Sequence, residues 1–169
     1  MKRVSAKIEN NFLNAYDLYS DQIYRHCFFR VSDEERATDL VADTFTKVWQ
    51  YLAQGGEIKN IRAFLYKVAN NLIIDHYRKK KTTSLDQLAE DHNFDPPENT
   101  HEKIEQESEI HLLTKTLDKL EDEYKEVMIM RYIDGLSIKE ISEIKEESQN
   151  AVSVRLHRAT NKMKEILKI

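Results

Sequence analysis

The sequence is poor in the residues that break helices or cross-link a chain. Among 169 residues there are only three glycines, two prolines and one cysteine. A β-sandwich or β-barrel needs a glycine- or proline-containing turn about every ten residues, so these folds are excluded, whereas an all-helical chain needs few such residues. The single cysteine, Cys27, excludes a disulfide framework and a multi-cysteine zinc site. The histidines show none of the paired spacings of metal sites, so we expect no metal and no cofactor.

Long apolar runs are also missing. Residues 1–10 contain none, and the chain nowhere reaches the roughly eighteen consecutive apolar residues that a membrane helix needs. We therefore expect a cytoplasmic protein with no membrane insertion of its own. There is no serine or cysteine nucleophile with histidine partners at a recognisable spacing, and no glycine-rich phosphate loop. The sequence does not predict an enzyme.

Acidic charge is concentrated in the middle of the chain. Residues 82–110 carry one basic and nine acidic side chains, and they also hold both prolines, Pro96 and Pro97. Few large apolar residues occur there, which is typical of a solvated linker. We predict two small helical domains, 1–81 and 111–169, joined by a flexible acidic linker, in an all-α fold.

Three apolar stripes at helical spacing occupy the first domain. They run through residues 8–27, 37–52 and 61–72. Ser32 followed by Glu35 has the capping-box pattern, so the second helix is predicted to begin at Ser32.

The second domain has the pattern of a helix-turn-helix. Ser137 and Glu140 form a further capping-box pattern at the start of a short helix, and Ser148 can cap the longer helix that follows. Such a helix fits the DNA major groove. The alternative, without DNA binding, is a three-helix bundle whose polar face is merely solvated. The candidate DNA contacts are Lys139, Asn150, Ser153, Val154, Arg155, His157 and Arg158.

Two further patterns in the first domain are weaker evidence for a binding surface. The basic run 78–81 lies near Tyr66 and Tyr77, which combines phosphate-binding charge with rings that can stack on bases, although solvated charge at a helix end is the commoner origin. Asp39 and Asp43 lie one turn apart near Trp49 and suit a protein interface. A half-buried Trp beside solvated acids is the alternative.

Taken together, these segments resemble a known family. RATDLVADTFTKVW (36–49), IRAFLYKVANNLIIDHYR (61–78), LEDEYKEVMIMRYIDGLSIKEISEI (120–144) and VRLHRA (154–159) are similar, in order and spacing, to the extracytoplasmic-function group of sigma-70 RNA polymerase sigma factors. The resemblance covers nearly the whole chain except the linker. It implies an initiation factor that docks on core RNA polymerase, reads promoter DNA and promotes open-complex formation.

The resemblance also implies roles for particular residues. Asp39, Asp43 and Trp49 would contact the clamp helices of the polymerase β′ subunit, and the second domain would read the minus-thirty-five element and touch the β flap. An anti-sigma factor would be a further partner. The melted minus-ten strand would be held by Lys59, Asn60, Arg62, Tyr66, Asn70, Asn71, Arg78 and Lys79.

The sequence departs from the family in the helix-turn-helix. The family usually has an apolar residue, a glycine and a proline-containing turn where this chain has residues 145–148, and a cation and a serine at Ser153 and Val154. Losing a cation weakens phosphate attraction. Two alternatives therefore remain: an adaptor or decoy that binds polymerase without reading a promoter, and a stand-alone helix-turn-helix repressor.

Overall fold

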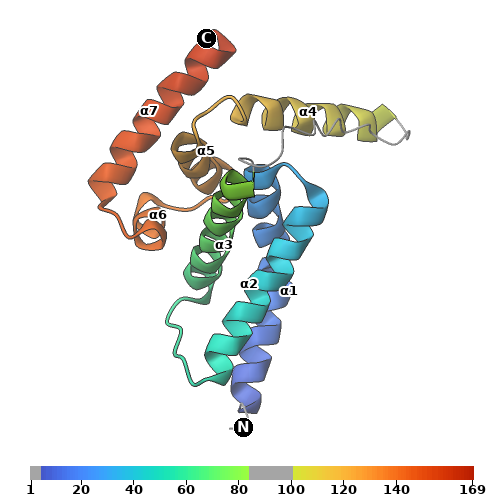
Figure 1. Ribbon diagram of the computed structural model, residues 1–169, viewed down its shortest axis with the longest axis vertical. Coiled ribbons are helices and arrows are strands. Elements are labelled where there is room, and N and C mark those ends of the chain that lie inside the picture. Colours follow the sequence, from blue (N-terminus) through green and yellow to red (C-terminus); the bar gives the residue numbers. More distant parts are fainter. Residues whose placement is uncertain (1–4, 84–100) are drawn as a thin grey trace.

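The structure, a computed structural model, describes residues 5–83 and 101–169 (Figure 1). In this part of the chain every regular element is a helix. The all-α fold with two helical halves is confirmed, while the predicted linker, with Pro96 and Pro97, lies largely outside the described residues. The helices are α1 (Ala6–Val31), α2 (Glu34–Ala53), α3 (Ile61–Thr83), α4 (His101–Leu117), α5 (Asp122–Met128), the π-helical turn η1 (Ile129–Ile133), α6 (Ile138–Lys145) and α7 (Gln149–Leu167).

The start of α2 differs from the sequence prediction. Asp33, rather than Ser32, is the N-cap, and its carboxylate accepts a hydrogen bond from the Arg36 N–H at 2.9 Å. Ser32 instead ends α1 in the left-handed conformation, with φ 54°. Aspartate caps a helix as well as serine does, and Ser32 lies in the left-handed turn that reverses the chain between α1 and α2. The capping-box prediction was wrong here by one residue.

The caps predicted in the second half are confirmed. The Ser137 hydroxyl accepts from the Glu140 N–H at 3.1 Å, and the Glu140 carboxylate accepts from the Ser137 N–H at 2.8 Å. Ser148 accepts from the Ala151 N–H at the start of α7. Gly135 follows η1 with φ 67°, a conformation that L residues avoid. These caps fix α6 and α7 as a helix-turn-helix.

The two halves pack against each other and share a large apolar core, with a second, smaller cluster of Phe29, Leu117, Leu120 and Ile129. In Figure 1, α5 and α6 lie beside α3, and α4 runs across the end of the bundle where α1 ends. Helix α6 contacts α3, and η1 contacts α1. The shared core contains, from the first half, Ile23, Cys27, Leu65, Tyr66, Ala69 and Ile73 and, from the second half, Val127, Met130, Leu136, Ile141, Ile144 and Val152.

Neither a membrane-spanning helix nor a cluster of metal ligands occurs among the described residues. None of their helices is long and apolar enough to cross a membrane. They also contain no group of three or more His, Cys, Asp or Glu side chains that could hold a metal ion.

Candidate nucleic-acid interface

The outward face of the helix-turn-helix carries most of its predicted DNA contacts. Val152, Leu156 and Ala159 of α7 are buried, so the opposite side of the helix faces solvent. Ser153 is half-buried at the edge of that side. Arg158 has no ion-pair partner among the described residues and is a free cation at this surface. The exposed members of the predicted set are Lys139, Asn150, Val154, His157 and Arg158.

Arg155 differs from Arg158 because acidic neighbours hold it. Its guanidinium donates to Glu147, and its Nε lies 3.4 Å from a carboxylate oxygen of Glu123. The hydrogen bond to Glu147 raises the pKa of Arg155, although partial burial opposes that effect. Arg155 is thus half-buried and neutralised within the chain, and so is Glu147, one of the two acids in the altered turn 145–148.

The Glu146 carboxylate is neutralised in a different way, by the other half of the molecule. Its Oε1 lies 2.6 Å from the Nζ of Lys67 on α3. This hydrogen bond and the ammonium charge hold the pKa of Glu146 below its ordinary value. Both acids of the altered turn therefore have cationic partners.

The residues predicted to hold the melted strand divide into an exposed and a covered group. Arg62, Tyr66 and Asn70 face the second half of the molecule, and only Arg62 keeps partial exposure. Exposed residues flank them along α3 and the loop before it: Lys59, Asn60, Asn71, Arg78 and Lys79.

Arg62 is occupied by groups from the helix-turn-helix. Its Nη1 donates to the Glu140 carboxylate at 2.8 Å, and its Nη2 donates to the Asp134 carbonyl at 3.1 Å. The bond from the Ser137 backbone, above all, and the Arg62 charge hold the pKa of Glu140 below its ordinary value. The guanidinium also lies 5.7 Å from the centre of the Tyr66 ring.

Tyr66 and Asn70 are enclosed. Tyr66 is fully buried, its ring meets that of His26 edge to face at 5.3 Å, and its hydroxyl has no hydrogen-bond partner. Burial raises the pKa of this hydroxyl strongly. The Asn70 side-chain oxygen accepts a bond from Arg30 at 2.7 Å. Neither residue reaches solvent in this arrangement.

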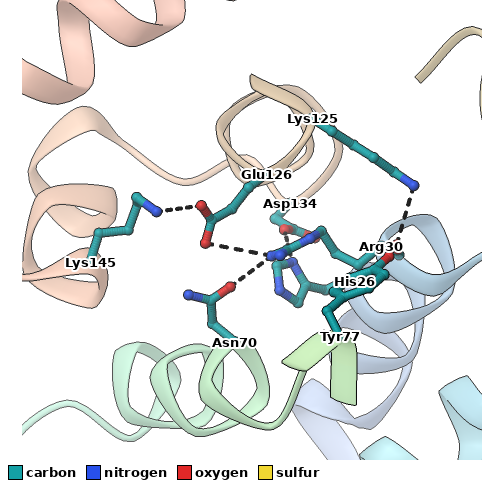
Figure 2. A network of polar contacts seen from close by, with 8 residues as sticks. All are labelled: His26, Arg30, Asn70, Tyr77, Lys125, Glu126, Asp134 and Lys145. Atoms are coloured by element: carbon teal, nitrogen blue, oxygen red, sulfur yellow. Dashed lines mark hydrogen bonds and ion pairs between the residues drawn. The ribbon is translucent and has the colours of Figure 1, made fainter. Parts of the chain in front are cut away.

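A buried polar network joins the two halves (Figure 2). The Nδ1 of His26 lies 2.6 Å from Asp134, and Arg30 lies 3.6 Å from Glu126. Glu126 also binds Lys145. Burial alone would raise the pKa of Glu126, but Arg30 and Lys145 outweigh it and hold that pKa below its ordinary value.

The backbone carbonyl of Arg30 is a second junction in this network. It accepts hydrogen bonds from the Tyr77 hydroxyl and, at 3.2 Å, from the Lys125 ammonium. Sequence reasoning missed the network. The available signal was His26 and Arg30, polar residues one turn apart and adjacent to the apolar stripe that includes Cys27.

The loop before α3 lines a small cavity. The cavity has a volume of about 190 Å³, with Glu57–Asn60 and Phe64 on one side and Glu143 and Ile144 of α6 on the other. The loop that the family resemblance assigns to a flipped base therefore faces α6 across this cavity, while its Lys59 and Asn60 stay exposed.

The acidic face of α2 remains open. Asp39 and Asp43 are exposed one turn apart, and Asp43 lines a groove of about 440 Å³ between α2 and α3. Trp49 is half-buried, with its ring 5.1 Å from that of Phe12. The described structure thus gives Trp49 a packing role, while leaving the two acids free to meet a partner.

Two family models match the chain in succession. A model described as Sigma-70 region 2 matches residues 15–83, and one described as Sigma-70, region 4 matches residues 110–163. The first includes α3 and the second includes the helix-turn-helix.

Two curated relatives match over nearly their full length. The ECF RNA polymerase sigma factor SigW of Bacillus subtilis is 27% identical over 182 aligned positions, which cover 99% of this chain and 95% of SigW. The RNA polymerase sigma factor YlaC of the same organism is 29% identical over 163 positions, covering 94% of this chain and 92% of YlaC.

Solved structures share the fold. The sigma factor RpoE in complex with the anti-sigma factor NepR, from Bartonella quintana, superposes with a TM-score of 0.75 at 22% identity, covering 94% of this chain and 98% of RpoE. CnrH, in complex with the cytosolic domain of CnrY, superposes with a TM-score of 0.72, also at 22% identity, covering 95% of this chain and 89% of CnrH.

Proposed function

Because the chain belongs to the extracytoplasmic-function group of the sigma-70 family and is an alternative RNA polymerase sigma factor, we propose how its helices divide the work of transcription initiation. The proposal is carried by one observation: a region 2 match over α1–α3 is followed in the same chain by a region 4 match over the helix-turn-helix. We assign core polymerase binding to α2, the minus-ten element to α3 and the minus-thirty-five element to α7.

Helix α2 would dock on the clamp helices of the β′ subunit. Exposed Asp39 and Asp43 give it a pair of negative charges with no ion-pair partner among the described residues. Such charges at the rim of an interface steer association and fix its register. Trp49 would contribute indirectly, because it packs α2 against α1 through Phe12.

Helix α3 and the loop before it would hold the melted non-template strand. Tyr66, which is buried in the described arrangement, would offer a ring for stacking once the second half moves off α3, and Arg62 and Arg78 would offer charge for the backbone. A base captured outside the duplex is recognised by its exposed hydrogen-bonding edge, and its capture stabilises the melted state. The protein would thus open DNA by binding free energy alone, without hydrolysing anything.

Helix α7 would enter the major groove of the minus-thirty-five element. Asn150, Val154 and His157 lie on its exposed side and can meet base edges, while Arg158 and Lys139 can meet phosphates. Val154 suits the methyl group of a thymine. The paired Arg155 would orient α7 rather than contact DNA directly.

The same assignment implies partners and a compartment. We propose the β flap of the polymerase as a second contact for the helix-turn-helix, and an anti-sigma factor as a regulator, which is supported by the complex of RpoE with NepR. Action on chromosomal promoters would take place in the cytoplasm.

Transcription in vitro tests the proposal. Purified protein and bacterial core polymerase are incubated with fragmented genomic DNA, and new start sites are mapped by sequencing. We expect new starts that share a motif about ten base pairs upstream, because α3 reads that element. A second shared motif further upstream would support the role of α7.

A second candidate function is a polymerase-binding adaptor that does not read a promoter. The observation that favours it is the pairing of Glu146 with Lys67 and of Glu147 with Arg155, which uses two cations that could otherwise meet phosphates. Stable binding to core polymerase without any new start would favour the adaptor over the initiation factor.

A further inference from the structure

We propose that Glu147 and Glu123 determine promoter specificity by holding Arg155 away from DNA. This inference rests on the proposed function, because it takes α7 as the reader of the minus-thirty-five element. It adds that a basic residue of the reading helix is withheld from phosphates by carboxylates of the same chain. The two acids are positioning residues, which act on DNA only through Arg155.

Three elements of the helix-turn-helix half meet at the Arg155 side chain. Arg155 lies on α7, Glu147 lies in the turn before it, and Glu123 lies on α5. The guanidinium donates to the Glu147 carboxylate, and its Nε lies 3.4 Å from a carboxylate oxygen of Glu123. The Glu147 backbone N–H is bound as well, because it donates to the Ser142 carbonyl of α6 at 3.0 Å. These contacts tie the first half of α7 to α5 and to the turn.

Arg155 lies beside the side of α7 that faces solvent. It comes one turn before the exposed Arg158, and residues three apart are neighbours on a helix surface. Its predecessor Val154 is exposed on the proposed reading face. The Arg155 side chain itself is only 21% exposed. If its acidic partners released it, its guanidinium would reach the phosphates next to those proposed for Arg158.

The cluster of Arg155, Glu123 and Glu147 has an excess of negative charge. One guanidinium and two carboxylates carry a net charge of −1. The hydrogen bond to Glu147 raises the pKa of Arg155, against the opposite effect of partial burial. The cluster therefore repels phosphates, although it contains an arginine. A phosphate that binds Arg155 must first displace a carboxylate that uses the same kind of charge-assisted hydrogen bond.

Withholding this cation favours specific binding over non-specific binding. Non-specific affinity for DNA comes almost entirely from cations that neutralise phosphates. Specificity is a difference between two affinities, and a repulsive element against the wrong sequence increases it. The base contacts proposed for Asn150 and Val154 need α7 in a fixed register, which its tie to α5 supplies. The two acids would thus weaken binding to every sequence and preserve the recognition of one.

Holoenzymes assembled from charge variants test the inference. The probes are two DNA duplexes with the same minus-ten element, one with the upstream motif of a mapped start site and one with that motif scrambled. Glu147→Gln removes one negative charge and keeps an oxygen that accepts from Arg155. Glu147→Gln with Arg155→Gln restores the net charge of the wild-type cluster and is the matched control. Fluorescence anisotropy at several salt concentrations measures each affinity and its salt dependence.

We expect Glu147→Gln to bind the scrambled duplex about fivefold more tightly, with a salt dependence steeper by a slope of about one, because Arg155 gains a phosphate. The gain on the intact duplex should be smaller, since a neutral hydrogen bond holds α7 in register less firmly than a charged one. The ratio of the two affinities should therefore fall. The double variant should return the affinity for the scrambled duplex, and its salt slope, to the wild-type values.

Several results would overturn the inference and leave the proposed function standing. Unchanged affinities and slopes for Glu147→Gln would do so. Weaker binding to the intact duplex without a steeper slope on the scrambled one would also do so, because loosened packing alone gives that result. The same holds if the double variant keeps the tighter binding, since the gain then does not pass through Arg155.

Two further controls separate the remaining explanations. Glu109→Gln removes the same charge from an exposed position on α4, so an equal gain for this variant would show a general charge effect and contradict the inference. A wild-type holoenzyme that binds the intact and scrambled duplexes equally would overturn the assignment of α7 to the minus-thirty-five element, and the inference with it.

Discussion

His26 of α1 and Asp134, 108 residues later, lie 2.6 Å apart between Nδ1 and Oδ2, and both side chains are almost completely buried. The bond fixes the turn after η1 against α1 and so places α6 over α3. We expect Asp134→Ala to lower the free energy of unfolding by about 1–3 kcal/mol, because His26 loses its buried partner. Urea denaturation followed by circular dichroism measures this change.

Two matched variants control that experiment. Asp134→Asn retains an oxygen that can accept from the imidazole, so its loss of stability should be smaller. Asp122→Ala removes an exposed aspartate outside the network and should have a lesser effect. If all three variants unfold at the same urea concentration, the His26 contact does not stabilise the packed arrangement.

Glu126 makes the packed arrangement sensitive to acid. The folded carboxyl has its pKa below the ordinary value of 4.5, because Arg30 and Lys145 outweigh the opposite effect of burial. Its stabilising contribution is therefore complete above about pH 4.5 and is lost as the pH falls through the lower, folded pKa. We expect the wild type to lose stability more steeply than Glu126→Gln on acidification through this window. Parallel pH profiles of urea denaturation would contradict the assignment.

The helices could be predicted from the sequence because their determinants are local. Apolar spacing along α7 and the capping pair Ser137 and Glu140 are set by neighbours within one or two turns, and both predictions are confirmed. Ser32 was placed wrongly because Asp33 caps a helix equally well and local chemistry does not choose between them.

The contact between the halves could not be predicted in the same way. His26 meets Asp134 and Arg62 meets Glu140 only after α1, α3 and the helix-turn-helix have packed. No spacing rule relates residues so far apart in the chain. The site residues proposed from the family resemblance remain predictions. Because Tyr66 is buried, contact of its ring with DNA requires the second half to separate from α3.

The turn of the helix-turn-helix carries backbone strain at Glu146, which has φ 56°. Glycine adopts this conformation without the steric penalty of a Cβ atom. We expect Glu146→Gly to unfold at a higher urea concentration than Glu146→Ala. Both variants lose the carboxylate that meets Lys67, so their difference reports the backbone alone. A lower midpoint for the glycine variant would contradict this account.

Asp43 offers a test of polymerase docking. Asp43→Lys reverses an exposed charge on α2, and we expect it to weaken binding to core polymerase about tenfold, since a like-charge contact replaces a favourable one. Competition against another sigma factor for core polymerase measures the change. Glu109→Lys makes the same charge change on α4 and should compete like the wild type. Unchanged competition by Asp43→Lys would remove α2 from the proposed interface.

Arg158 tests whether the altered helix-turn-helix still binds DNA. It is exposed on α7, whereas Arg155 is already neutralised by Glu147 and Glu123. We expect Arg158→Glu to weaken promoter binding by the holoenzyme about tenfold or more and to leave polymerase binding intact. The salt dependence should fall by a slope of about one, as for one lost phosphate contact. Lys164→Glu changes the same charge near the end of α7 and should retain promoter affinity. If Arg158→Glu binds the promoter as the wild type does at every salt concentration, then α7 does not contact the duplex through this face.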